Sequence, residues 1–361
     1  EIDQLLKSHE GEKHLIVLQE YPDPDAISCA LAHRIVCETY DIETAIVHGG
    51  RISHQENIAL VRLLNVQLQR WLKDMDLAEF DGAVFLDNQG TTAREIVNKL
   101  QTEEIPLLVI IDHHDAQDMI EAEFMDVRPL GSTATIYAEY LKEGLLDLDA
   151  DEETHLRMAT ALMHGIFSDT KGFINAGEAD FKAAAYLSQF RDDEMLHTIM
   201  SQARSRQTMA IIQRALENRS VVESYSIVGV GYLRSEDRDA IPQAADFLLT
   251  EENIHTSIVF GIVREDGGGE TMVGSLRTSK LTLEPDDFIK EVFGQAEDGG
   301  YFGGGKKSAG AFEIPIEFLA GDADSEFEEM KWQVYEAQVK RKFFDKLGID
   351  QDTDGNDREA G

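Results

Sequence analysis

Cysteine is nearly absent from this sequence, and so are long apolar runs. The 361 residues include two cysteines, Cys29 and Cys37, which fall on one expected helix too far apart to form a disulfide. This usage favours a reducing, cytoplasmic compartment in which both thiols are packing residues. The apolar runs span only a few residues, so no helix is expected to cross a membrane. The N-terminal residues show no signal peptide, although the first residue is Glu and not Met.

Basic residues are also scarce. The chain has 33 lysines and arginines against 69 aspartates and glutamates, which gives a net charge of −36. A surface this acidic is a poor partner for long nucleic acid, because neutralising phosphates requires lysine and arginine. It still allows a small anionic substrate where cations are concentrated locally, and it also suits solubility in concentrated salt. The 42% hydrophobic content is enough for ordinary cores, and the length is comfortable for two domains.

Short apolar stretches alternate with helical patterns in the first half of the chain. The patterns predict strands at 15–18, 44–48, 82–87 and 107–112, and helices at 26–36, 56–65 and 91–100. Thr91 is the expected cap of the last of these helices. Three more helical stretches follow before residue 195. This alternation predicts an α/β domain whose parallel sheet is covered by helices on both faces.

The rest of the chain predicts a second, smaller α/β domain. Its strand patterns at 226–233, 256–263 and 271–277 flank a helix at 241–249, and the turn at 265–270 joins the last two strands as a hairpin. A polar helix precedes it as a linker. The expected boundaries are 1–195 for the first domain, 196–222 for the linker, 223–320 for the second domain, and 321–361 for a C-terminal helix and a disordered acidic tail.

Acidic and histidine side chains follow three predicted strands and one predicted helix. They are Asp23 and Asp25, Asp87, Asp112 with His113 and His114, and Asp169. The carboxyl ends of parallel strands meet at one edge of a sheet, where ligands bind in open α/β folds. Any one of these aspartates could instead be a helix cap or a turn residue. Their recurrence at successive element ends favours a shared site.

Clustered carboxylates without basic partners repel each other, and a divalent cation removes that repulsion. Carboxylate and imidazole ligands together suit manganese, iron or zinc better than calcium. Four or five such ligands could hold two ions, as in sites for phosphoryl displacement.

The ordered set of motifs PDPDAIS, VFLDN, IIDHHDA and GIFSDTKGF resembles that of the DHH phosphoesterase superfamily. The later GSLRTSK and GGGKKSAGAF resemble its DHH-associated, substrate-binding domain. The resemblance covers about 15–318. It implies a first domain that carries a dinuclear metal site and a second domain that binds substrate. Among members of the superfamily, the chain looks most similar to the nanoRNase, pAp-phosphatase and cyclic-dinucleotide phosphodiesterase groups.

The resemblance also implies a role for each site residue. One ion would be held by Asp23 and Asp87. The other would be held by Asp25, Asp87, His113 and Asp169, so that Asp87 bridges the two. Asp112, His113 and His114 would form the catalytic motif, with His114 facing the substrate phosphate and Asp112 orienting a neighbouring histidine. The expected cofactor is Mn²⁺, with two ions of which one is weakly bound.

This sequence departs from the superfamily's pattern at two positions. Gln19 stands where a metal-ligating histidine is usual, and Lys306 follows Gly303, Gly304 and Gly305 where a histidine is usual. The glycines would let backbone N–H groups approach an anion, and Lys306, Lys307 and Arg277 would add positive charge. The alternatives are a flexible loop for the glycines and an ordinary surface strand residue for Arg277.

The expected activity is metal-dependent hydrolysis of small phosphoesters such as short oligonucleotides, linear dinucleotides or pAp. Two alternatives stay open. One is hydrolysis of pyrophosphate or polyphosphate, and the other is a non-catalytic, nucleotide-binding regulator with one degenerate metal site. The expected partner is a small phosphorylated substrate, with no long nucleic acid and no membrane, and the chain could form a homodimer.

Overall fold

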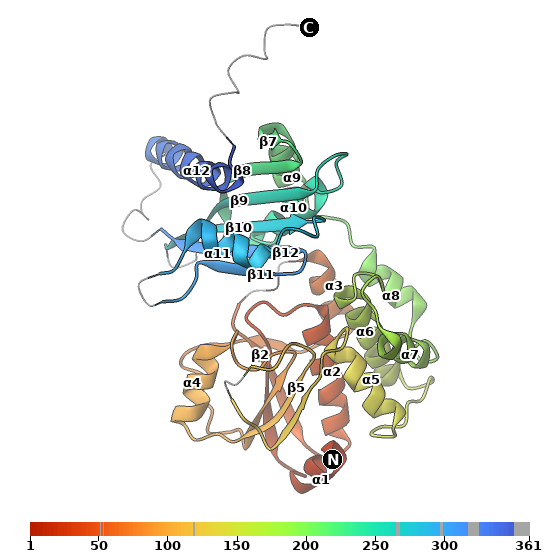
Figure 1. Cartoon of the computed structure of the whole chain (residues 1–361). Coiled ribbons are helices and arrows are strands. Elements are labelled where there is room, and N and C mark those ends of the chain that lie inside the picture. The colour runs from red at the N-terminus through yellow and green to blue at the C-terminus, as the bar shows by residue number, and fades with distance from the viewer. Residues whose placement is uncertain are drawn as a thin grey trace, which may run out of the picture. The chain divides into compact units, whose positions relative to one another are not determined.

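The chain divides into two compact units, Glu1–Ala203 and Arg204–Gly361. The computed structural model (Figure 1) describes residues 1–50, 52, 54–117, 120–264, 268–296, 299–316 and 325–349. The expected tail and part of the 265–270 turn therefore lie outside the described residues. In the part that is described, no helix is long and apolar enough to cross a membrane.

The first unit contains a six-stranded sheet in the order β3-β2-β1-β4-β5-β6, with every neighbouring pair parallel. Its strands are β1 (Lys13–Val17), β2 (Glu43–His48), β3 (Leu68–Arg70), β4 (Gly82–Leu86), β5 (Leu107–Asp112) and β6 (Phe124–Val127). Its helices are α1 (Ile2–Ser8), α2 (Pro24–Glu38), α3 (Gln55–Leu63), α4 (Arg94–Thr102), α5 (Thr133–Lys142), α6 (Glu153–Asp169), α7 (Glu178–Leu187) and α8 (Asp193–Met200).

Both faces of this sheet are buried, because alternate strand residues enter different cores. Ile16 of β1 packs with the apolar residues of α2, α5 and α6. Its neighbours Leu15 and Val17 pack on the other face with those of α4 and with Trp71. The strand order reverses at β1, which lies between β2 and β4. The carboxyl ends of β1, β4 and β5 therefore lie side by side at the point where such folds bind ligands.

The second unit is built on a mixed sheet in the order β11-β12-β10-β9-β8-β7, in which only β8 and β9 are parallel. Its strands are β7 (Ser220–Val222), β8 (Tyr225–Arg234), β9 (Thr256–Arg264), β10 (Glu270–Thr278), β11 (Gly303–Lys306) and β12 (Ala309–Pro315). The helices α9 (Arg206–Asn218) and α10 (Ala240–Leu248) contribute to one core, and α11 (Pro285–Phe293) and α12 (Ser325–Leu347) to the other. A short 3₁₀ helix spans Ser235–Asp237. The predicted fold class, a parallel-sheet domain followed by a smaller α/β domain, is confirmed.

Two local expectations were wrong. Thr91 does not cap a helix, because residues 90–93 form a turn closed by the Ala93 N–H and the Gly90 carbonyl, and α4 begins at Arg94. The single helix expected over 196–222 is two helices, since the Ser205 hydroxyl accepts from the Thr208 N–H and caps the start of a second helix, α9. The flexible loop that was the alternative for Gly303, Gly304 and Gly305 is not observed, because these residues belong to the strand β11.

Candidate metal centre

The loop after β1 places Asp23 and Asp25 at the start of α2. Asp23 is the N-cap of the helix, and its Oδ1 accepts from the Ala26 N–H at 3.0 Å. Asp25, in the first turn, is fully buried. Its two oxygens accept from the backbone N–H groups of Thr133 and Ala134 at 2.6 and 2.9 Å, at the start of α5. Asp23 is thus a helix cap, which was the alternative to a site residue, whereas Asp25 is held by a segment that is distant in the sequence.

Asp87 follows β4 directly and is buried to 1% exposure. Its backbone N–H donates to the Ile111 carbonyl of β5 at 2.9 Å, and its Oδ1 accepts from the Thr133 hydroxyl at 2.9 Å. The Gln19 amide nitrogen lies 3.5 Å from Asp87 Oδ2. Gln19 therefore does reach the site at the position where the resemblance expects a histidine.

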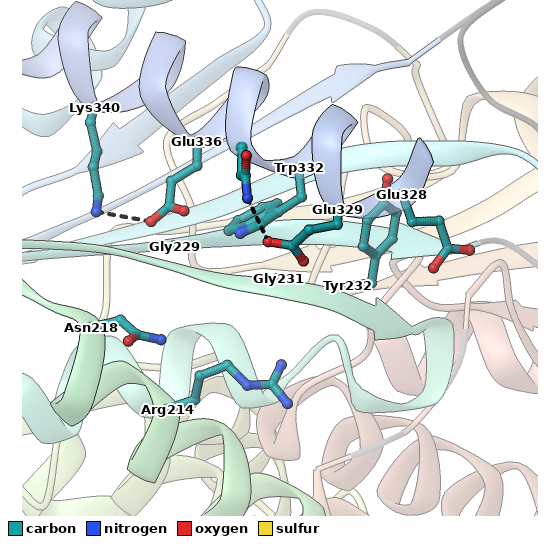
Figure 2. Close-up of a pocket in the computed structure, with 11 residues that line it drawn as sticks. Arg214, Asn218, Gly229, Gly231, Tyr232, Glu328, Glu329, Trp332, Glu336 and Lys340 are labelled. Atoms are coloured by element: carbon teal, nitrogen blue, oxygen red, sulfur yellow. Dashed lines mark hydrogen bonds and ion pairs between the residues drawn. The ribbon is translucent and has the colours of Figure 1, made fainter. Parts of the chain in front are cut away.

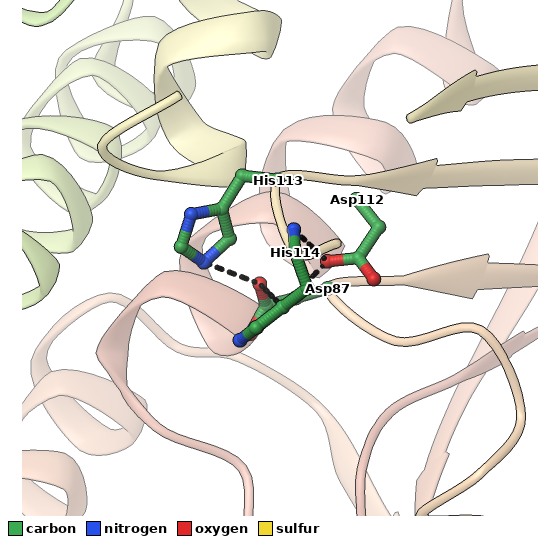
Figure 3. A group of neighbouring side chains, drawn as sticks. All are labelled: Asp87, Asp112, His113 and His114. Carbon is green, nitrogen blue, oxygen red and sulfur yellow. Dashed lines mark hydrogen bonds and ion pairs between the residues drawn. The ribbon is translucent and has the colours of Figure 1, made fainter. Parts of the chain in front are cut away.

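Two histidines follow β5 and turn toward Asp87 (Figure 3). His114 Nδ1 lies 2.7 Å from Asp112 Oδ1 and 3.8 Å from Asp87 Oδ1. Asp112 is itself fixed by the Gln89 amide, which donates to its Oδ2 at 2.7 Å. These contacts hold the pKa of Asp112 below its usual value although burial opposes them. Asp112 is thus an anion that orients the neighbouring imidazole.

His113 connects Asp87 with Asp169, the last residue of α6. Its Nδ1 lies 3.1 Å from the Leu130 carbonyl, which favours a proton on that nitrogen. Its Nε2 lies 3.5 Å from Asp87 Oδ1 and 3.1 Å from Asp169 Oδ2. This buried Nε2 has no well-directed hydrogen bond among the described residues. This nitrogen therefore faces two carboxylates, which favour a proton on it in the metal-free chain, and a bound metal ion would replace that proton.

Burial and mutual repulsion raise the pKa values of Asp23, Asp25 and Asp87. Desolvation and then the charge of Asp169 raise the pKa of Asp23 to about 6. Desolvation raises the pKa values of Asp25 and Asp87 well above the usual range, with neighbouring aspartates adding to it. Burial opposes protonation of His113, but Asp169 and Asp25 together raise its pKa to about 9. The cluster is short of positive charge.

These residues fit a divalent metal. Two overlapping groups each place their ligand atoms within 4.8 Å of one another: Asp87, Asp112, His113 and His114 in one, and Asp25, His113 and Asp169 in the other. Between described residues, the ion pairs of these carboxylates are with histidines alone. Buried carboxylates that have no lysine or arginine partner among the described residues, together with the imidazole nitrogen that faces them, form the donor set that Mn²⁺ or Zn²⁺ takes.

Sequence reasoning missed the residues that fix these ligands. Thr133 supports both Asp25 and Asp87, and Gln89 supports Asp112. Thr133 lies in the segment Gly131-Ser132-Thr133, where Ser132 is the N-cap of α5. That local capping pattern was visible in the sequence, but the long-range contacts to β1 and β4 were not.

In the second unit, the predicted substrate-binding residues belong to β10 and to the β11 segment, and β12 lies between these two strands. Arg277 is the penultimate residue of β10, where its Nε donates to Asp246 Oδ1 at 2.8 Å and its Nη1 to the Ser275 hydroxyl at 2.7 Å. The three glycines and Lys306 form β11, and Lys307 begins the turn to β12. The Gly305 N–H donates to Asp286 Oδ1 at 3.0 Å, so at this position the partner of the backbone is a carboxylate.

A separate cavity of about 750 Å³ lies in the second unit, between α9, β8 and α12 (Figure 2). It is lined by Arg214, Trp332 and the glycines of β8, among others. A Cβ on Gly229 would come within 2.5 Å of the Trp332 ring, so a glycine is needed where the helix packs against the strand. The cavity contains none of the predicted substrate-binding residues.

Three known proteins are similar in sequence. An uncharacterized protein of Methanocaldococcus jannaschii is 34% identical over 96% of this chain and 67% of its own length. The cyclic-di-AMP phosphodiesterase GdpP of Geobacillus thermodenitrificans is 26% identical over 72% of this chain and 40% of its own length. A probable manganese-dependent inorganic pyrophosphatase of Lactobacillus delbrueckii is 25% identical over 44% of this chain and 48% of its own length.

The fold is shared with a solved structure, an exopolyphosphatase-related protein from Bacteroides fragilis. The TM-score is 0.66 at 17% identity, and the match covers 94% of this chain and 96% of that one. The family model described as the DHH family, N-terminal domain, matches residues 13–166, which include every ligand of the candidate centre except Asp169. With the sequence relatives, this match shows that the chain belongs to the DHH family.

Proposed function

We propose that this chain is a manganese-dependent hydrolase of small phosphoesters, with short oligonucleotides, linear dinucleotides or pAp as substrates. The observation that carries the proposal is the convergence of five carboxylates and two histidines at the carboxyl edge of the first sheet. Membership of the DHH family supports the hydrolase class. Two similar proteins, a cyclic-di-AMP phosphodiesterase and a probable manganese-dependent pyrophosphatase, support phosphorus chemistry and the metal.

In this proposal, Asp23 and Asp87 hold one ion, and Asp25, Asp87, His113 and Asp169 hold the second. The ions would supply an activated water and positive charge beside the phosphoryl oxygens. Leu130 accepts the Nδ1 proton of His113, which leaves Nε2, beside Asp87 and Asp169, as the nitrogen that would bind the ion. Thr133 fixes the carboxylates of Asp25 and Asp87 in place.

His114 is the proposed contact to the substrate phosphate. Asp112 occupies its Nδ1 at 2.7 Å, which leaves Nε2 to meet an anionic oxygen. His114 is also more exposed than His113, with side-chain exposures of 26% and 12%. In the second unit, Arg277, Lys306, Lys307 and the backbone of Gly303, Gly304 and Gly305 are the proposed anion-binding groups.

A substrate panel tests this function. The purified chain is assayed for release of AMP from pApA, of phosphate from pAp, and of phosphate from pyrophosphate and polyphosphate, each with Mn²⁺, Mg²⁺, Co²⁺ or Zn²⁺. The proposal predicts turnover of pApA or pAp with Mn²⁺ and its loss with a chelator. Faster turnover of pyrophosphate would favour the alternative suggested by the pyrophosphatase relative. Binding of these compounds without turnover under any metal would contradict an enzyme and support a regulator.

A further inference from the structure

A second group of candidate ligands lies at the opposite end of β1. His9 is the C-cap of α1, Glu12 precedes β1, and His14 is the second residue of the strand. His9 Nδ1 lies 2.8 Å from Glu12 Oε2, and His14 Nε2 lies 3.2 Å from the same oxygen. All three ligand atoms lie within 4.8 Å of one another. Two imidazole nitrogens from different elements therefore converge on one carboxylate oxygen.

The three side chains of this cluster differ in their exposure to solvent. His14 is buried to 1% exposure, whereas the side chains of His9 and Glu12 are 16% and 33% exposed. The group is therefore fixed on the core side and accessible from the other. The second ring nitrogen of His14, Nδ1, is buried and has no hydrogen-bond partner among the described residues.

A second carboxylate lies close to the other ring nitrogen of His9. Its Nε2 lies 3.6 Å from Oε2 of Glu123, which comes just before β6. A metal-bound histidine commonly offers its other ring nitrogen to such a carboxylate, which fixes the tautomer and the direction of the lone pair. Glu123 therefore lies where the carboxylate partner of a metal-bound His9 would be. It belongs to a segment more than a hundred residues further along the chain.

The spacing of the three donor atoms suits a tetrahedral ion. Zn–N and Zn–O bonds of about 2.0–2.1 Å place neighbouring ligand atoms about 3.3 Å apart in a tetrahedron. The distances from Glu12 Oε2 to His9 Nδ1 and to His14 Nε2, 2.8 and 3.2 Å, approach this value without a change of rotamer or backbone. Two imidazoles and one carboxylate are also a ligand set that zinc takes, with a water in the fourth position.

We propose that His9, Glu12 and His14 form a zinc site at the amino-terminal edge of the first sheet, distinct from the candidate metal centre. The remaining three residues of β1, about 10 Å at 3.3 Å per residue, separate His14 from the end of the strand that leads to Asp23. Its role is structural: the ion holds the end of α1 against β1. The competing state is a purely hydrogen-bonded cluster in which both imidazoles donate to Glu12.

The test is a count of bound zinc in the full chain. The unmodified protein, the variant with both His9→Gln and Glu12→Gln, and the control His197→Gln are saturated with Zn²⁺, freed of excess, and analysed for metal. His197 is an exposed histidine of α8, so its loss changes the imidazole content without touching the cluster. The proposal predicts that the double variant retains one equivalent less than the other two proteins and that its rate of phosphoester hydrolysis is unchanged.

A second readout uses Co²⁺ in place of zinc. The unmodified chain should show visible absorption from a tetrahedral histidine-ligated ion that is missing in the double variant, and circular dichroism checks that the variant is folded. Should the double variant unfold, Glu12→Gln alone serves, with an expected loss of zinc affinity of at least tenfold. Equal zinc content and equal Co²⁺ spectra in all folded variants would overturn the proposal and leave the hydrogen-bonded cluster. This count does not depend on whether the other centre is catalytic.

Discussion

Asp87 has a backbone conformation that residues other than glycine rarely adopt. Its φ is +58°, in the left-handed region that aspartate tolerates better than most side chains. Strain of this kind costs about 1–3 kcal/mol and persists where the surrounding structure enforces it. Here the enforcement comes from the Ile111 carbonyl and the Thr133 hydroxyl. The carboxylate proposed to bridge two ions is therefore positioned by the fold before any ion binds.

Gln19 leads to a prediction about the two ions. An amide oxygen is a weaker ligand for Mn²⁺ than an imidazole, so one ion should bind tightly and the other loosely. Gln19→His should tighten the loose site and shift activation to lower Mn²⁺, whereas Gln101→His, on the exposed side of α4, should change neither. Calorimetric titration with Mn²⁺ measures both affinities. Two equally tight ions in the unmodified protein would contradict this prediction and would mean that another residue supplies the missing ligand.

At the scale of elements, the helices and strands that were predicted best are those with a long apolar pattern of their own. The strands β1, β4 and β5 were predicted from their apolar runs. The acidic residues that follow these strands were predicted from their position in the sequence. The strands β3 and β6 were missed because they are three and four residues long. The support of Asp25 by Thr133 could not be predicted, because it depends on how α5 packs against α2, and the two residues are 108 positions apart in the sequence.

The packing of α2 against α5 also contains a buried histidine. His33 is fully buried, its Nδ1 lies 2.9 Å from the Tyr137 hydroxyl, and desolvation lowers its pKa to about 3. A histidine that is neutral in the folded state but titrates near 6.5 when unfolded stabilises the fold above pH 6.5. That stability is lost progressively as the pH falls toward 3, with about 2 kcal/mol lost between pH 7 and pH 5.

Replacing His33 should therefore flatten the acid branch of the stability curve. His33→Gln should lower stability at pH 7 but lose about 2 kcal/mol less than the unmodified chain between pH 7 and pH 5. Urea unfolding of the metal-free protein at several pH values measures this difference. The control His197→Gln should follow the unmodified curve. Parallel curves for His33→Gln and the unmodified chain would show that His33 is charged in the folded state.

At the scale of the whole molecule, the proposal divides the work between two units of one chain. The metal ligands belong to the first unit, and the proposed anion-binding cations belong to the second. A net charge of −36 makes those few cations important, because an anionic substrate is otherwise repelled by the surface. The family model covers only residues 13–166, so the role of the second unit depends on measurements of substrate binding.

Replacing Arg277 or Lys306 tests whether the second unit binds the substrate. Arg277→Ala and Lys306→Ala should each raise KM for the preferred substrate while metal content stays the same. A lost charge-assisted contact of about 1.5–3 kcal/mol corresponds to roughly 10–150-fold. Asp246→Ala is the matched control, because it breaks the ion pair of Arg277 without removing the guanidinium. If Asp246→Ala raises KM as much as Arg277→Ala does, Arg277 is structural and binds no substrate.

The most direct test of the central claim is hydrolysis by Asp87→Asn, measured against the surface control Asp74→Asn over a range of Mn²⁺. Loss of an outer-shell partner of a metal ligand already costs about 10–100-fold, so loss of a bridging ligand should cost more than that. The variant should bind fewer Mn²⁺ ions and remain folded, with an apo melting temperature equal to or above that of the unmodified chain, because a repelling carboxylate is gone. Turnover and Mn²⁺ content equal to those of Asp74→Asn would contradict the account.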